Sequence, residues 1–186
     1  SIDPIVITCQ IVNSLQTIVS RKINPLDPVV ITCGRIQGGD CHNVIPNEVE
    51  LEGTIRTFNE ETRNWVPKVM EDLIRGITTS QGAAYEFKYE PKYPALINDK
   101  YMTSFAKESL KKVVGEENVF DLKEPNMGGE DFAYFAQKVP SAFIFVGIAN
   151  NKSEPVIHHN PYFKWDSKNV GILAQSLSQI AIDYLK

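Results

Sequence analysis

Two β-branched runs joined by a polar loop constrain the fold of this 186-residue chain more than any other feature. The first run covers Val29–Ile36 and the second covers Val49–Phe58, where apolar and polar residues alternate as in a half-buried strand. The loop between them contains two glycines and a proline, and it is long enough for the chain to reverse direction. We therefore predict an antiparallel hairpin with one apolar face that must be covered.

Two amphipathic helices flank the hairpin and can cover that face. The first has Asp3 as its cap and Pro4 at its first position. The second follows Asn59 and runs to about Ser80, and Pro67 either kinks it or marks its first turn. The apolar stripe predicted for the first helix consists of Thr8, Ile11, Val12, Leu15, Ile18 and Val19.

A third strand is predicted after the second helix, because Tyr85, Phe87 and Tyr89 point to one side of an alternating run. The order helix, strand, strand, helix, strand is typical of an α+β sandwich of the ferredoxin-like, split βαβ type. That pattern begins with one more strand, which we expect before Ser1.

Prolines at positions 91 and 94 predict a boundary near residue 96. Beyond it, helices alternate with short apolar runs, which indicates part of an α/β sheet covered on both sides. We expect helices at 98–115, 132–137 and 170–184, and strands at 119–122 and 142–148.

Composition excludes several classes of partner. A net charge of −4 with interspersed acids and bases gives no surface for nucleic acid or for an anionic membrane. No apolar run reaches the length of a membrane span and no signal-like start is present, so we expect a cytoplasmic protein. The three cysteines, Cys9, Cys33 and Cys41, form no C-x-x-C pair and are expected to be small buried apolar residues.

Three stretches carry residues suited to chemistry. His158 and His159 follow an apolar run, where an imidazole can bind a metal or transfer a proton, although a solvated loop would look the same. Gly128 and Gly129 precede a short helix and can expose N–H groups to a carboxylate, whereas the acids that follow can simply cap that helix.

The third stretch is the hairpin itself. Arg56 lies on the polar face of its strand and can grip a carboxylate, or it can pair across the sheet with Glu50 or Glu52. Asn43 in the loop can donate to a carbonyl oxygen or an oxyanion, or it can only shape a turn.

Four motifs in register give these residues a common context. The stretches "DPIVITCQIVNSLQTIVSR", "GGDCHNVIPNEVELEGTIRTF", "MGGEDFAY" and "IHHNPYF" resemble the dinuclear metallopeptidases of the aminoacylase, hippurate hydrolase and indole-acetyl-amino-acid hydrolase branch, which also contains carboxypeptidase G. The resemblance runs from the first residues to the last helix. It implies a catalytic domain with two divalent metal ions and an inserted ferredoxin-like lid that forms a homodimer.

The resemblance assigns roles to parts of the chain. Residues 1–95 would be the lid, and residues 96–186 the C-terminal portion of a zinc-peptidase-like α/β catalytic domain. His159 would bind one metal, and His158 stands where the family often has an apolar residue. The substrate-binding residues that it implies are Asn43, Arg56, Gly128, Gly129 and Glu130.

The chain also departs from the family. The family's other metal ligands and its glutamate base are not in the sequence, so we expect no catalytic residue here and at most one weakly bound metal, and we expect this chain to be an inactive fragment. The intact enzyme would cleave an N-acyl amino acid into an acid and an amino acid with zinc, manganese, cobalt or nickel. The alternative is a non-catalytic dimerisation or small-ligand-binding module.

Overall fold

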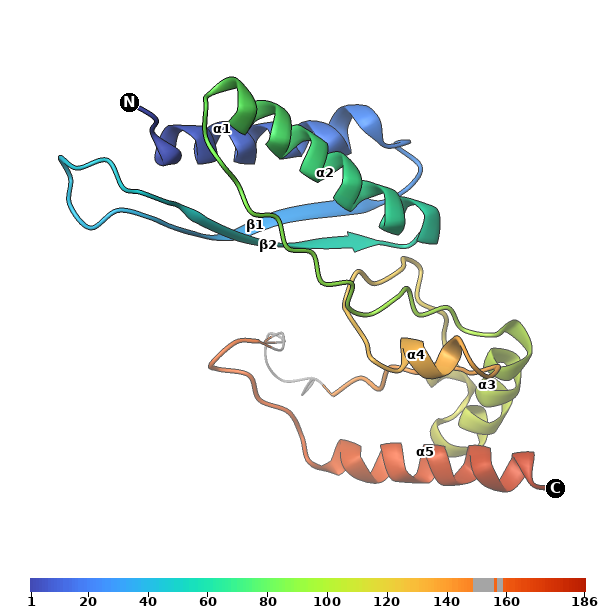
Figure 1. Cartoon of the computed structure of the whole chain (residues 1–186). Helices are drawn as coiled ribbons and strands as arrows, with labels where there is room; N and C mark the ends of the chain where they lie inside the picture. The colour runs from blue at the N-terminus through green and yellow to red at the C-terminus, as the bar shows by residue number, and fades with distance from the viewer. Residues whose placement is uncertain (149–155, 157–158) are drawn as a thin grey trace. The chain divides into compact units, whose positions relative to one another are not determined.

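The computed structural model describes residues 1–148, 156 and 159–186 (Figure 1). The chain divides into two compact units, of which the first comprises Ser1–Ala95 together with Met127–Gly129. The second unit comprises Leu96–Asn126 and Glu130–Lys186. The predicted mixed α/β class is confirmed, with a two-stranded antiparallel sheet in the first unit. Among the described helices, none is both long and apolar enough to cross a membrane.

The first helix, α1, spans Pro4–Thr17 and continues as the π-helical turn η1 at Ile18–Lys22. Its predicted cap is confirmed, because the Asp3 carboxylate accepts hydrogen bonds from the backbone N–H groups of Ile5 at 3.0 Å and Val6 at 3.4 Å. A carboxylate at this place also faces the positive end of the helix dipole, so the start of α1 is stabilised twice.

The predicted hairpin is confirmed. Strand β1 spans Val29–Gln37 and strand β2 spans Glu50–Thr57, and the two strands pair antiparallel from end to end. The loop between them needs its glycines. A Cβ at Gly38 would lie 2.6 Å from the Val49 side chain, and Gly39 has a φ of 81°, a conformation that side chains with a Cβ rarely adopt.

The second helix, α2, spans Glu60–Ser80, and Asn59 caps it by accepting from the backbone N–H of Glu61 at 2.8 Å. Pro67 lies inside this helix, so the prediction that it could mark the first turn is wrong. Its missing N–H leaves one helical hydrogen bond unmade, and the Asn59 cap shows that the helix starts well before it.

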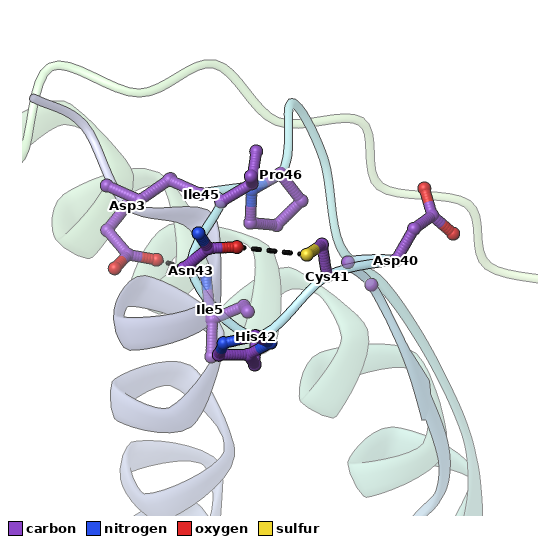
Figure 2. A pocket seen from close by; sticks show the side chains of 11 residues that line it. Asp3, Ile5, Asp40, Cys41, His42, Asn43, Ile45 and Pro46 are labelled. Atoms are coloured by element: carbon purple, nitrogen blue, oxygen red, sulfur yellow. Dashed lines mark hydrogen bonds between the residues drawn. The ribbon is translucent and has the colours of Figure 1, made fainter.

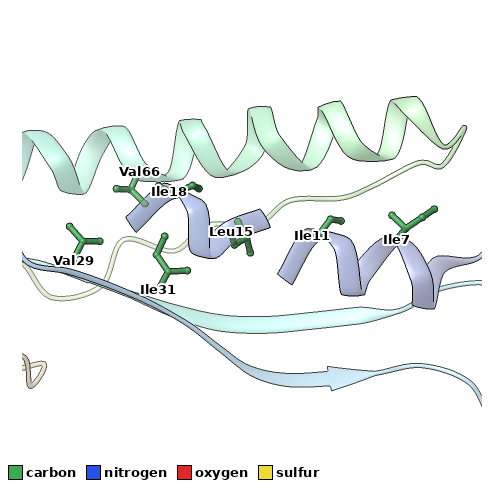
Figure 3. Close-up of a cluster of buried hydrophobic side chains, with 7 residues drawn as sticks. All are labelled: Ile7, Ile11, Leu15, Ile18, Val29, Ile31 and Val66. Carbon is green, nitrogen blue, oxygen red and sulfur yellow. The ribbon is translucent and has the colours of Figure 1, made fainter. Parts of the chain in front are cut away.

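The core of the first unit lies between the two helices and the hairpin (Figure 3). Ile18 and Val66 are fully buried, so η1 and α2 meet there without solvent. The positions at helical spacing in α1 and at alternate positions in β1 therefore form one cluster. Its buried members are Ile7, Ile11, Leu15, Ile18, Val29, Ile31 and Val66.

The prediction of a third strand in the first unit is wrong. Residues 83–88 alternate between half-buried and exposed as a strand would, yet no ladder pairs them, because the sheet found in the described residues holds only β1 and β2. Alternation predicts which side chains face a core, whereas strand formation needs a neighbour for the backbone N–H and C=O groups. The alternating sequence pattern therefore predicted which side chains face the core, but it did not predict whether a strand forms.

The second unit is mainly helical. Helix α3 spans Lys100–Val114, capped by Asp99, and the short turn η2 spans Glu116–Asn118. Helix α4 covers only Ala133–Ala136 and helix α5 spans Lys168–Tyr184. The three predicted helices of this unit are therefore confirmed with small changes at their ends.

The two strands predicted for this unit are wrong. Neither 119–122 nor 142–148 forms a ladder among the residues that the structure describes. The Asn98 side-chain amide instead bonds both backbone groups of Phe143, accepting from its N–H at 2.8 Å and donating to its C=O at 2.9 Å. A side chain thus takes the place of a neighbouring strand. The prediction failed because an apolar run indicates burial but does not indicate a pairing partner.

Large apolar side chains of α5 are exposed. Leu173 is 40% exposed, Leu177 54% and Tyr184 63%, whereas Ser176 on the same helix is buried. The described residues of the second unit therefore do not cover these side chains. Polar contacts therefore have a large part in connecting α5 to α3.

The main polar contact between α3 and α5 is built around Asp183. Its carboxylate, whose side chain is 10% exposed, accepts from Lys112 Nζ at 2.9 Å and from Gln179 Nε2 at 3.0 Å. Hydrogen bonds from Lys112, Ser109 and Gln179 lower the pKa of Asp183 from its ordinary 3.8 to about 2. The folded state therefore stabilises the charged form of Asp183.

Replacing Asp183 by asparagine is expected to weaken the second unit. Because the folded pKa lies below the unfolded one, the carboxylate stabilises the fold fully above pH 3.8, and this contribution is lost as the pH falls towards 2. At pH 7 we expect a Tm lower by about 4–8 °C, as for a modest loss of stability in a unit of this size. Thermal unfolding followed by circular dichroism tests this, and equal acid sensitivity of Asp183→Asn and wild type would contradict it.

Candidate functional site

Arg56 lies on the exposed face of β2, opposite Val30 in the register. The sequence also allowed Arg56 to form an ion pair with Glu50 or Glu52 in place of binding a ligand. In the structure these two acids pair with Arg35. Arg35 Nη1 lies 2.9 Å from Glu50 Oε2 and 3.0 Å from Glu52 Oε1. Among the described carboxylates, none forms an ion pair with Arg56, so its charge is not consumed by its own sheet.

Arg56 is held by the backbone and not by an acid. Its Nη1 donates to the carbonyl oxygen of Met127 at 2.9 Å, a contact within the first unit. One N–H of the five on a guanidinium is thereby used, and the fork that can bind a carboxylate remains. Gly129 lies next to Arg56 and Tyr93. A Cβ built on Gly129 would be 3.6 Å from Arg56 Nη1 and 3.2 Å from the Tyr93 ring.

Asn43 lines an open depression of about 610 Å³ between the hairpin loop and the start of α1 (Figure 2). Its Oδ1 accepts from the thiol of Cys41 at 2.9 Å. Because that oxygen is occupied, the amide presents its N–H groups to an incoming acceptor. The cysteine expectation is wrong in part, since Cys9 and Cys41 are exposed and Cys33 is half-buried.

Asn43 and Arg56 lie towards opposite ends of the hairpin. Arg56 is six residues along β2 from Glu50, which borders the loop, and this corresponds to about 20 Å at the rise of an extended strand. The structure therefore brings Arg56 together with Gly129 and keeps Asn43 apart from both. A molecule much shorter than this separation cannot contact both residues in one copy of the chain as it is folded here.

Of the remaining predicted residues, Gly128 belongs to the first unit together with Gly129, whereas Glu130 and His159 belong to the second. Glu130 accepts from the backbone N–H of Phe132 at 3.2 Å, so it caps the turn before α4, as the sequence analysis allowed for the acids that follow the glycines. His159 is exposed and has a φ of 66°, a left-handed conformation that is uncommon for a residue with a side chain. His158 lies outside the described residues.

The described residues do not form a metal site by themselves. Within 1–148, 156 and 159–186, no group of three or more histidine, cysteine, aspartate or glutamate side chains could hold an ion. A centre with two metals needs several such donors, and one imidazole at His159 does not fit that requirement. A centre with two metals would therefore need donors from outside the described residues.

Comparison with known proteins identifies the family of this chain. Residues 6–182 match the family described as Peptidase family M20/M25/M40, which is most of the chain. The chain belongs to this family. The resemblance predicted from the four motifs is thereby confirmed, and the M20 family carries the metallopeptidase and amidohydrolase activities that the motifs indicated.

The similarity to relatives within the M20 family extends over the full length of this chain. N-acetylcysteine deacetylase of Bacillus subtilis is 37% identical over 100% of this chain and 47% of its own length. IAA-amino acid hydrolase ILR1-like 4 of Arabidopsis thaliana is 34% identical over 100% of this chain and 43% of its own length. The chain thus spans about half the length of the curated relatives it matches.

A solved structure of the M20 family agrees with the fold. The crystal structure of the Bacillus subtilis protein YXEP, titled a dinuclear metal binding peptidase, matches with a TM-score of 0.75 and 33% identity. The match covers 99% of this chain and 46% of that protein. Dinuclear metal binding is therefore a property of that relative.

Three contacts of the candidate site were missed by sequence reasoning: the carbonyl of Met127, the ring of Tyr93 and the thiol of Cys41. A backbone carbonyl carries no residue-type signal, and Cys41 was expected to be a buried apolar residue. Tyr93 stands directly before Pro94, which restricts its backbone to extended conformations, and this signal could have drawn attention to it.

Proposed function

We propose that this chain contributes the substrate-holding part of a metal-dependent amidohydrolase that cleaves N-acyl amino acids into a carboxylic acid and a free amino acid. In this proposal residues 1–95 form a lid and dimerisation domain, and residues 96–186 belong to the catalytic domain. The named substrates of the two relatives, N-acetylcysteine and IAA-amino acids, are amides of amino acids, which supports this substrate class. Because the described residues hold no metal site, the chain alone is not expected to catalyse.

The observation that carries the proposal is the state of Arg56. It is a charged side chain on an exposed strand face, held at one nitrogen by the Met127 carbonyl and bound to no described acid. Such a guanidinium can bind the carboxylate of an amino acid through parallel hydrogen bonds. Gly129 lies beside it, so no side chain at this position stands next to the guanidinium.

Asn43 is proposed to hold the acyl carbonyl oxygen. Its amide is oriented by the Cys41 thiol, so the N–H groups face outwards into the depression beside α1. An N–H donor placed where negative charge develops on the carbonyl oxygen lowers the barrier to its attack. Arg56 and Asn43 would thus hold the amino-acid part and the acyl part on either side of the scissile amide.

A homodimer is proposed because the two residues are too far apart in one copy. The substrate core spans about 7 Å, the extended length of two residues, whereas Arg56 and the hairpin loop are separated by about 20 Å. Two copies related by a two-fold axis can bring Asn43 of one to Arg56 of the other, and they create two identical sites.

His159 is proposed to supply one metal ligand, with the other donors outside the described residues. We expect His159→Asn to lower the content of zinc, manganese, cobalt or nickel in the whole gene product by about one ion per chain. Asparagine tolerates the left-handed backbone of His159, so the variant removes the imidazole without new strain. Elemental analysis after dialysis measures this. His42→Asn removes another exposed histidine and serves as the control, and equal metal content in both variants would contradict the role.

The function is tested by comparing an N-acetyl amino acid with its C-terminal carboxamide as substrates of the whole gene product with added metal. The proposal predicts release of the free amino acid and a clear preference for the carboxylate. The competing possibility is a non-catalytic dimerisation or ligand-binding module. Absence of hydrolysis with every metal, together with retained binding of the acyl amino acid, would favour that module.

A further inference from the structure

We infer that Tyr93 is a positioning residue that holds the Met127–Gly129 segment against Arg56 and so fixes the guanidinium for its substrate. This inference rests on the proposed carboxylate-binding role of Arg56 and adds a residue that acts through it. All the residues concerned belong to the first compact unit.

The contact that carries the inference is the approach of Tyr93 to Gly129. A Cβ built on Gly129 would lie 3.2 Å from Cδ2 and 3.8 Å from Cε2 of the Tyr93 ring, and 3.6 Å from Arg56 Nη1. The ring and the guanidinium therefore meet the same point of the backbone. Two residues earlier on the same segment, the Met127 carbonyl accepts from Arg56.

Tyr93 is itself well placed to act as a support. The residue before it, Lys92, accepts at its carbonyl from Arg63 Nη2 of α2 at 2.7 Å. The residue after it, Pro94, is buried and restricts Tyr93 to extended backbone. The backbone on both sides of the ring is thus held in place within the first unit.

The Met127–Gly129 segment needs such a support, since it lies in no helix or strand of the described chain. Arg56 and Met127 are 71 residues apart in sequence, so no local structure keeps them together. An arginine side chain loses much conformational entropy when it is ordered, and a pre-ordered guanidinium binds a carboxylate more tightly than a free one. The ring contact on Gly129 provides this order.

A double-mutant cycle on the whole gene product tests the inference. With an N-acetyl amino acid as substrate, Tyr93→Ala is expected to raise KM by about tenfold with little change in kcat. Tyr93→Phe should keep the wild-type KM, because the contact atoms belong to the ring. In the Arg56→Ala background, Tyr93→Ala should have no further effect on KM, since its partner is gone.

Glycine variants provide a second test if Tyr93→Ala does not fold. Gly129→Ala places a methyl 3.2 Å from the ring, so the ring must give way and KM should rise, by about two- to fivefold. Gly34→Ala is the matched control, because a Cβ there meets nothing within 4 Å. Circular dichroism of each variant reports whether it is folded.

The outcomes separate this inference from the proposed function. If Arg56→Ala raises KM but Tyr93→Ala and Gly129→Ala do not, Tyr93 has no positioning role and the carboxylate site stands. An equal effect of Tyr93→Ala with and without Arg56 would also overturn the inference, because Tyr93 would then act independently. If Arg56→Ala leaves KM unchanged, both the carboxylate site and the inference are wrong.

Discussion

Replacing Arg56 by alanine is expected to lower kcat/KM for an N-acetyl amino acid by about 10- to 100-fold, the value of hydrogen bonds to a charged group. The reason is specific to this side chain. Arg56 is bonded at Nη1 by the Met127 carbonyl and lacks an acidic partner among the described residues, so its remaining N–H groups can serve a ligand carboxylate. The activity on the corresponding carboxamide should change little, because it carries no charge for Arg56 to recognise. Steady-state kinetics on both substrates measures the difference.

Arg35→Ala is the matched control for this prediction. Arg35 is another exposed arginine of the hairpin, and it is engaged by Glu50 and Glu52 within its own sheet. Exposed ion pairs of this kind contribute little, so the variant should keep its catalytic constants. An equal loss on carboxylate and carboxamide substrates in Arg56→Ala would mean that the residue has a structural role and binds no carboxylate.

Replacing Asn43 by alanine is expected to lower kcat by about 10²- to 10³-fold, the usual effect of removing one donor to a developing oxyanion. The amide of Asn43 is oriented by Cys41, and its N–H groups face an open depression. The effect should appear mainly in kcat, because the charge on the carbonyl oxygen is largest in the transition state. Initial rates at saturating substrate measure it.

Asn47→Ala provides the control, since Asn47 belongs to the same loop but does not line that depression. Its kcat should match the wild type. If Asn43→Ala changes KM alone and leaves kcat unchanged, Asn43 binds substrate and transition state equally, and the assignment to the carbonyl oxygen is wrong.

Sequence reasoning succeeded where the physical signal is local. The caps at Asp3, Asn59 and Asp99 each lie next to the backbone N–H groups that they bind, so the starts of α1, α2 and α3 could be predicted closely. The hairpin was also predictable, because alternating runs on both sides of a glycine loop have few other ways to pair.

The strands that were predicted wrongly depend on partners elsewhere. Residues 83–88 and 142–148 have the alternation or apolar character of strands, but a ladder requires a second backbone at hydrogen-bonding distance. In one case no neighbour is found in the described chain, and in the other the Asn98 side chain bonds the backbone of Phe143. Local sequence cannot distinguish these situations.

The candidate site was predictable in its residue types and not in its contacts. Arg56, Asn43 and Gly129 became candidates because the family resemblance implies substrate-binding roles for them, and their chemistry suits a carboxylate and a carbonyl. The Met127 carbonyl could not be identified in this way, since every residue has one, and its pairing with Arg56 spans 71 positions. The separation of Asn43 from Arg56 likewise follows from the register of the hairpin, which only the structure provides.

The most direct test of the shared substrate site is to mix the Asn43→Ala and Arg56→Ala variants of the whole gene product, let the subunits exchange, and measure hydrolysis of an N-acetyl amino acid. If each site takes Asn43 from one copy and Arg56 from the other, half of the dimers are mixed and each contains one intact site. At substrate concentrations well below KM, the mixture should then recover about a quarter of wild-type activity, whereas each variant alone should retain at most about a tenth. Activity no higher than the mean of the two variants would contradict the shared substrate site.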